Sequence, residues 1–78
     1  MAKISAMLLI GTETGSERNV YLELKKHNEI EFVHELFGSW DIIAKLETED
    51  VQRMDEFVSD IVRNIPGVNS SATLIISR

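Results

Sequence analysis

The sequence predicts an α+β fold of the ferredoxin-like type, with its elements in the order β-α-β-β-α-β. Four short segments are apolar and bounded by turn residues, as strands are. Two segments between them have apolar residues at helical spacing. The chain therefore divides into two similar halves, each consisting of a strand, a helix and a second strand.

The first half opens with an apolar run at residues 4–10, closed by Gly11, which is typical of a strand buried on both faces. Thr14 and Glu17 then have the spacing of a capping box, so we expect a helix to begin there and to end at residues 27–28. The apolar face of this helix consists of Val20, Tyr21 and Leu24. Residues 4–28 are thus predicted to be a strand followed by a helix.

A hairpin is expected next. Residues 29–37 alternate loosely, as a strand does, and the strand-like pattern resumes at residues 42–46. The short corner between them, Gly38-Ser39-Trp40-Asp41, favours an antiparallel pairing of the two strands.

The second helix is the more strongly patterned of the two. Thr48 is the expected N-cap, and Glu49 and Asp50 would lie in the first turn, where the helix dipole favours acids. The apolar face contains Val51, Met54, Val58, Ile61 and Ile65. Residues 66–67, Pro-Gly, end the helix, and residues 68–76 form the last strand. Its side chains alternate, with Ala72, Leu74 and Ile76 on one face and Thr73 and Ile75 on the other.

One face of the predicted sheet lacks cover. Right-handed crossovers place both helices on the same face of a four-stranded antiparallel sheet. The first, third and fourth strands nevertheless have apolar residues on both faces, so the open face should be buried against another molecule. A domain of 78 residues without cysteines also has a marginal core. We therefore expect a homo-oligomer that begins with a sheet-to-sheet dimer.

Composition excludes several classes of function. The net charge of -5 is spread along the chain, and no basic stripe is present, which argues against direct contact with nucleic acid. No apolar segment approaches the roughly 20 residues that span a bilayer, so we expect a cytoplasmic protein without membrane contact.

Catalysis and metal binding are not expected either. The chain has no cysteine, and its two histidines, His27 and His34, have no evident nucleophile or co-ligand beside them. The segment at residues 11–15 lacks the lysine and the glycine spacing of a phosphate loop, so we expect a strand-to-helix turn there. The sequence thus predicts no enzyme, no cofactor and no metal site.

The corner at residues 38–41 has the groups that a small zwitterion requires. A glycine turn exposes N–H donors for a carboxylate, Ser39 adds a hydroxyl, and Asp41 offers a negative charge to an ammonium group. Trp40 supplies apolar cover. Judged on these residues alone, an ordinary hairpin turn that Asp41 stabilises is the favoured interpretation.

Three stretches, MLLIGTETGSERNV, FGSWDIIAKLETED and NIPGVNSSATLI, carry a resemblance to a known family that covers nearly the whole chain. They resemble the first strand, the Gly-x-x-Asp hairpin and the closing Gly-Val-x-x-x-x-Thr strand of the RAM domain, the ligand-binding domain of the Lrp/AsnC transcription regulators. The resemblance implies a ferredoxin-like subunit that dimerises through its sheets, with dimers assembling into octamers or decamers. It also implies an amino-acid effector held between dimers, beside the hairpin.

The resemblance identifies candidate site residues. The ligand-binding residues it implies are Gly38, Ser39, Trp40, Asp41, Ser71 and Thr73, and Glu35 is added from its position in the chain. Backbone amides of the loop would bind the effector's carboxylate and Asp41 its ammonium group, while Ser71 and Thr73 would reach it from a neighbouring subunit. From its position before the turn, Glu35 is expected to influence side-chain selectivity. Trp40 stands where that loop usually has Tyr or Phe.

Full-length members of that family begin with a helix-turn-helix module, whereas the first expected strand lies close to Met1. We therefore expect residues 1–78 to form a single RAM domain without a helix-turn-helix domain, which modulates a full-length Lrp/AsnC regulator by mixed assembly. Two alternatives share the element order. An ACT-like regulatory domain binds similar ligands, and a dimeric α/β-barrel enzyme would need titratable side chains where the alternation supplies mainly Ala, Leu and Ile.

Overall fold

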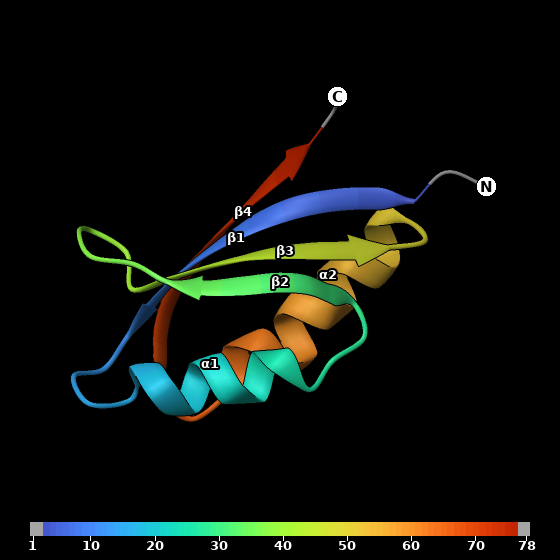
Figure 1. Ribbon diagram of the computed structural model, residues 1–78. Helices are drawn as coiled ribbons and strands as arrows, with labels where there is room; N and C mark the ends of the chain where they lie inside the picture. Colours follow the sequence, from blue (N-terminus) through green and yellow to red (C-terminus); the bar gives the residue numbers. More distant parts are fainter. Residues whose placement is uncertain (1–2, 77–78) are drawn as a thin grey trace.

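The computed structural model describes residues 3–76 as four antiparallel strands with two α-helices against one face of the sheet (Figure 1). The elements are β1 (Ile4–Thr12), α1 (Glu17–Lys25), β2 (Ile30–Glu35), β3 (Ile42–Thr48), α2 (Val51–Asp60), the 3-10 turn η1 (Val62–Asn64) and β4 (Val68–Ile76). The strand order across the sheet is β2-β3-β1-β4. This confirms the predicted ferredoxin-like α+β fold.

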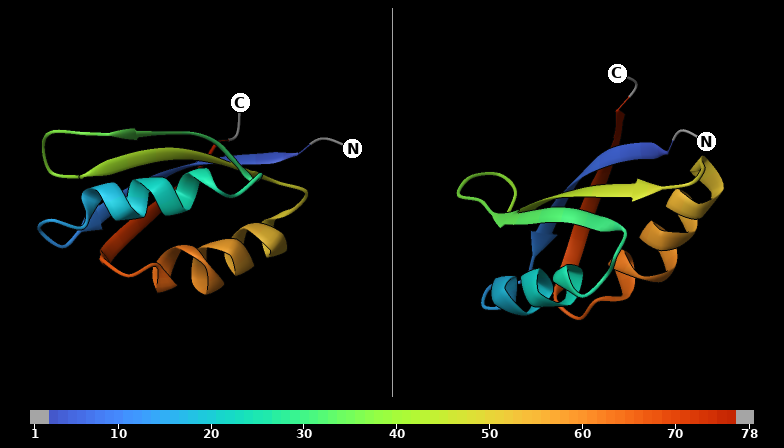
Figure 2. Two further views of the ribbon diagram at one scale, coloured as in Figure 1. Left: turned by 60° about the horizontal axis from the view of Figure 1, so that its bottom comes forward. Right: turned by 45° about the vertical axis from the view of Figure 1, so that its right-hand side comes forward.

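The core lies between the sheet and the helices. Alternate residues of the two central strands point into it, and Leu8, Ile10 and Leu46 are fully buried there. The helices and η1 contribute Val20, Leu24, Met54, Phe57, Val58 and Val62. Figure 2 shows α1 and α2 side by side below the same face of the sheet, as right-handed crossovers require.

The start of α1 differs from the prediction. Ser16 is the N-cap residue, and no side chain caps the helix. Residues 13–16 form a separate turn, because the Ser16 N–H donates to the Glu13 carbonyl at 2.9 Å. Since the helix begins at Glu17 itself, this residue is not three positions into it, and the predicted capping box with Thr14 is wrong.

The start of α2 differs in the same way. Asp50 is the N-cap, and its Oδ1 accepts a hydrogen bond from the Arg53 N–H at 2.8 Å. Thr48 is instead the last residue of β3, and its hydroxyl donates to the Asp50 carbonyl. Val51, expected on the buried face, is 46% exposed. The N-cap prediction at Thr48 was therefore wrong by two residues.

The hairpin is confirmed, but its connection is longer than predicted. β2 ends at Glu35, so the strand predicted to reach residue 37 gives way to a loop at residues 36–41, the β2–β3 loop. The Leu36 N–H donates to the Asp41 carbonyl at 2.8 Å and closes the base of this loop. Phe37 projects fully into solvent.

The face of the sheet opposite the helices, the open face, has no cover among residues 3–76. Residues directly opposite one another on neighbouring strands share a face, so the register assigns Met7, Leu9 and Leu74 to it. The rest of its residues include Ser5, Phe32, His34, Ile43, Lys45, Glu47, Ala72 and Ile76. The alternation predicted for β4 is thus confirmed, while β3 adds more polar groups than expected.

Neither helix of the described residues has the length and apolar character to cross a membrane.

Candidate functional site

The β2–β3 loop is attached to the end of β1. Regular pairing between β1 and β3 stops at Ile10 and Ile42. Just beyond this pair, the Asp41 N–H donates to the Ile10 carbonyl at 3.0 Å. The loop therefore leaves the sheet from a fixed point.

The side chain of Asp41 reinforces this attachment. Its Oδ2 accepts two hydrogen bonds from Thr12, one from the backbone N–H at 2.7 Å and one from the hydroxyl at 3.2 Å. Thr12 is only 8% exposed, whereas Asp41 is half-buried. Among residues 3–76, no donor binds the other carboxylate oxygen, Oδ1. One carboxylate oxygen of Asp41 is thus hydrogen-bonded within the subunit, and the other, the open oxygen, is available to a ligand.

The tip of the loop presents backbone donors. Within the described part of the chain, the N–H groups of Phe37, Gly38, Ser39 and Trp40 donate to no protein acceptor. Gly38 has a φ of +141°, a conformation that glycine adopts readily, and both it and Ser39 are exposed. Successive backbone N–H groups in a turn bind an anion where they converge on it. Together with the open oxygen of Asp41, the loop can offer donors to a carboxylate and an acceptor to an ammonium group.

Glu35 lies at the start of the loop and is already paired. Its Oε2 is 3.0 Å from Nη1 of Arg18 on α1, with 43% and 71% of the respective side chains exposed. Arg18 also lies 5.1 Å from the centre of the Tyr21 ring. An ion pair this exposed contributes at most about 1 kcal/mol. It nevertheless offsets the charge of Glu35 at the edge of the loop.

Ser71 and Thr73 lie elsewhere in the subunit. Ser71 pairs with Ile10 and Thr73 with Leu8, so both are on the helix side of β4. Because β1 separates β4 from β3, a single chain does not bring these hydroxyls beside Asp41. Their contribution from a neighbouring subunit stays a prediction.

Sequence reasoning did not find the partners of Asp41 at the end of β1. The sequence predicts Thr12 in a strand-to-helix turn, but β1 continues through this residue by pairing with Val68. Gly11 packs so closely on β4 that a Cβ there would collide with Ser70 Oγ and lie 3.0 Å from Asn69 Oδ1. These contacts join segments far apart in the sequence, so no local pattern could have revealed them.

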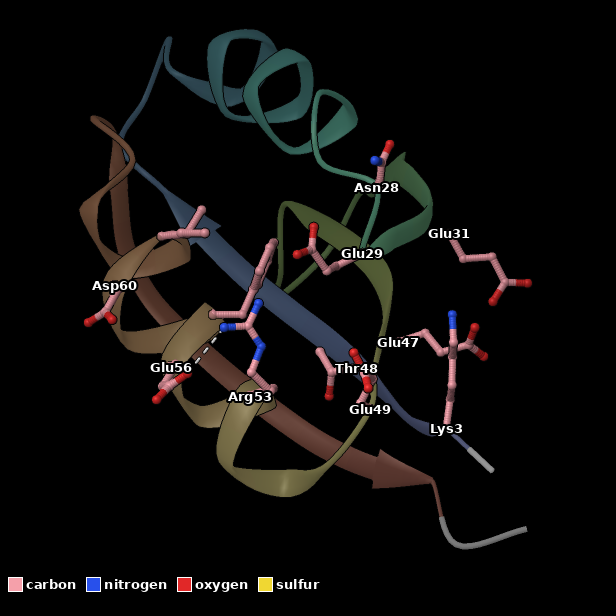
Figure 3. A pocket seen from close by; sticks show the side chains of 12 residues that line it. Lys3, Asn28, Glu29, Glu31, Glu47, Thr48, Glu49, Arg53, Glu56 and Asp60 are labelled. Atoms are coloured by element: carbon pink, nitrogen blue, oxygen red, sulfur yellow. Dashed lines mark hydrogen bonds and ion pairs between the residues drawn. The ribbon is translucent and has the colours of Figure 1, made fainter. Parts of the chain in front are cut away.

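A cavity of about 430 Å³ lies at the other end of the β2–β3 hairpin, beside α2 (Figure 3). It is lined by Lys3, Asn28, Glu29, Glu31, Glu47, Thr48, Glu49, Arg53, Glu56, Phe57, Asp60 and Ile61. Six acidic residues against two basic ones make this lining unfavourable for a free carboxylate. Among residues 3–76, no three His, Asp or Glu side chains are placed so that they could hold a metal ion together. The cavity shares no residue with the β2–β3 loop.

Comparison with known proteins gives a consistent result. The family model for the Lrp/AsnC ligand binding domain matches residues 5–78. The HTH-type transcriptional regulator FL11 of Pyrococcus abyssi is 32% identical over 71 residues, which cover 91% of this chain and 46% of the relative. The chain thus spans about half the length of the curated relatives it matches.

Solved structures agree with the fold. The crystal structure of FFRP-DM1 superimposes with a TM-score of 0.91 and is 29% identical, covering 94% of this chain and 97% of that one. The transcriptional regulator NMB0573 of Neisseria meningitidis, solved as a complex with L-Met, has a TM-score of 0.87. At 17% identity, covering 96% of this chain and 50% of that one, its likeness extends to the fold alone.

Proposed function

The chain belongs to the Lrp/AsnC ligand-binding domain family, and from this membership we propose that it is a cytoplasmic, non-enzymatic module that senses an amino acid. The effector binds beside the β2–β3 loop, at an interface between subunits. Its occupancy alters the assembly that regulates transcription.

The observation that supports this proposal most directly is that one loop contains both hydrogen-bond donors and a negatively charged acceptor. Four backbone N–H groups without a protein acceptor among residues 3–76 belong to the same loop as the open oxygen of Asp41. An α-amino acid carries a carboxylate and an ammonium group on the same carbon, so it matches a loop that offers both donors and an acceptor. L-Met in the structure of NMB0573 is an example of an amino acid bound to a protein of this fold.

Assembly completes the site in this proposal. The open face is buried in a dimer, and dimers join so that Ser71 and Thr73 of a neighbouring subunit approach the loop. A full-length regulator of the same family would present the same face, so mixed assembly with such a regulator is the route by which the module acts.

Replacement of Asp41 by Ala tests the proposal. We expect Asp41→Ala to weaken amino-acid binding by about 1.5–3 kcal/mol, the range for a hydrogen bond to a charged group. Asp41→Asn removes the charge but keeps an oxygen for Thr12, and it should also lose affinity. Isothermal titration calorimetry against each of the twenty standard amino acids gives the measurement.

The control is Asp55→Ala, which removes an exposed carboxylate from α2, away from the loop. It should bind as the wild type does. Unchanged affinity in both Asp41 variants would mean that the effector binds elsewhere. An absence of binding by the wild type at millimolar concentrations of every amino acid would refute amino-acid sensing itself.

A further inference from the structure

We propose that Thr12 is a positioning residue for the effector site, because it holds Asp41 in the orientation that a ligand's ammonium group requires. This inference rests on the proposed function. Thr12 itself is buried at the end of β1 and is not expected to touch the ligand.

The geometry gives Thr12 control over a single oxygen. Its N–H and its hydroxyl both donate to Oδ2 of Asp41, at 2.7 and 3.2 Å. Two donors on one oxygen fix the rotation of the carboxylate and therefore the direction in which Oδ1 points. A carboxylate held before binding loses less side-chain entropy when it meets an ammonium group, and the affinity is correspondingly higher.

The donors of Thr12 are available because the sheet is irregular at this point. Pairing of β1 with β3 ends at Ile10, so on that side the Thr12 N–H has no strand partner, and the carboxylate of Asp41 takes its place. On the other side of β1, the register with β4 shifts between Gly11 and Thr12. Gly11 packs against Ser70 at this shift, which holds the end of β1 in position.

Three variants test the role of the hydroxyl. Thr12→Val keeps the shape and the N–H but removes the hydroxyl, and Thr12→Ser restores a hydroxyl. The probe is whichever of the twenty standard amino acids binds the wild type most tightly. We expect Thr12→Val to weaken its binding about three- to tenfold, with Thr12→Ser within about twofold of the wild type. Thr12→Ala replaces the Val variant if that variant does not fold.

A double-mutant cycle and a ligand analogue distinguish a positioning role of Thr12 from a merely structural one. If Thr12 acts through Asp41, Thr12→Val should cause no further loss in the Asp41→Ala background. The carboxylic acid that lacks the probe's amino group should bind the wild type and Thr12→Val equally. Equal losses in both backgrounds, or a Thr12→Val variant with wild-type affinity for the amino acid, would overturn the proposal.

A measurement without ligand tests the positioning role of Thr12 independently of amino-acid sensing. Amide hydrogen exchange at Leu36 and Asp41 reports on the bonds that close the loop. We expect Thr12→Val to accelerate exchange there at least threefold, on the order of one lost hydrogen bond, while the amide of Leu8 in the core keeps its rate. If the wild type binds no amino acid, sensing is refuted. Unchanged exchange at Leu36 and Asp41 would refute the positioning role.

Discussion

At Gly67 the turn before β4 lies directly against the start of α1. A Cβ at this position would collide with the Cβ of Ser16 and lie 2.8 Å from its hydroxyl oxygen. The Gly67 carbonyl also accepts the Glu13 N–H at 2.8 Å. The two crossover connections of the fold therefore meet at a residue without a side chain, and its φ of +100° disfavours any other residue there.

Gly67→Ala should destabilise the protein by about 2–4 kcal/mol, because backbone strain and a collision add up. Gly15→Ala is the matched control: its φ is +89°, but nothing lies within 4 Å of an added Cβ, so only the strain remains. We expect that control to cost about 1 kcal/mol. Urea unfolding followed by circular dichroism measures both. Equal losses would show that the close contact with Ser16 has no energetic weight.

At the scale of elements, contacts between distant segments decide where each strand ends and the next helix begins. Periodicity predicted both α-helices, all four strands and the bounds of β4, but both helix starts were placed two or three residues early. The second helix was also predicted to reach residues 66–67, whereas α2 ends at Asp60 and the segment after it forms the 3-10 turn η1.

At the start of α2 the cause is strand pairing: Thr48 is opposite Ile4, so β3 continues into a segment with the local pattern of a helix start. At the start of α1 the cause is the separate turn at residues 13–16, which follows β1 and is attached to the segment before β4 by the hydrogen bond from the Glu13 N–H to the Gly67 carbonyl. Partners so distant in sequence are invisible to any local pattern. For the same reason, the loop could be predicted from its residues but its attachment to Thr12 could not.

The helix caps provide a test at this scale. Asp50→Ala should lower stability by about 1 kcal/mol, since it removes the side chain that accepts the Arg53 N–H. Thr14→Ala should change stability by less than about 0.5 kcal/mol, because Thr14 is exposed and caps no helix. Thermal unfolding of both variants beside the wild type distinguishes these values. A comparable loss at Thr14 would mean that the capping box forms after all.

For the whole molecule, the two faces of the sheet predict different responses to a charge. Leu74 and Ile75 are neighbours on β4 and are 55% and 54% exposed, but they point to opposite faces. Leu74 shares the open face with Met7, whereas Ile75 pairs with Ala6 on the helix side. An interface on the open face would bury the first side chain and not the second.

Leu74→Glu should therefore convert the oligomer into smaller species at micromolar concentration, because it would bury an unpaired carboxylate. Ile75→Glu, equal in exposure and chemistry, should leave the dimer through the open face intact. Sedimentation velocity measures the outcome. A monomeric wild type, or a response of both variants alike, would contradict dimerisation through the open face.

Because β1 is a central strand, it joins regions that would otherwise be independent. Its last residue holds the loop through Asp41, and Met7 and Leu9 of the same strand face the proposed partner subunit. Thermodynamic linkage then works in both directions: if an effector strengthens association by a given free energy, association strengthens effector binding by the same amount. The apparent affinity for an amino acid would accordingly rise with protein concentration, so that the cellular abundance of the module would set the metabolite level to which it responds.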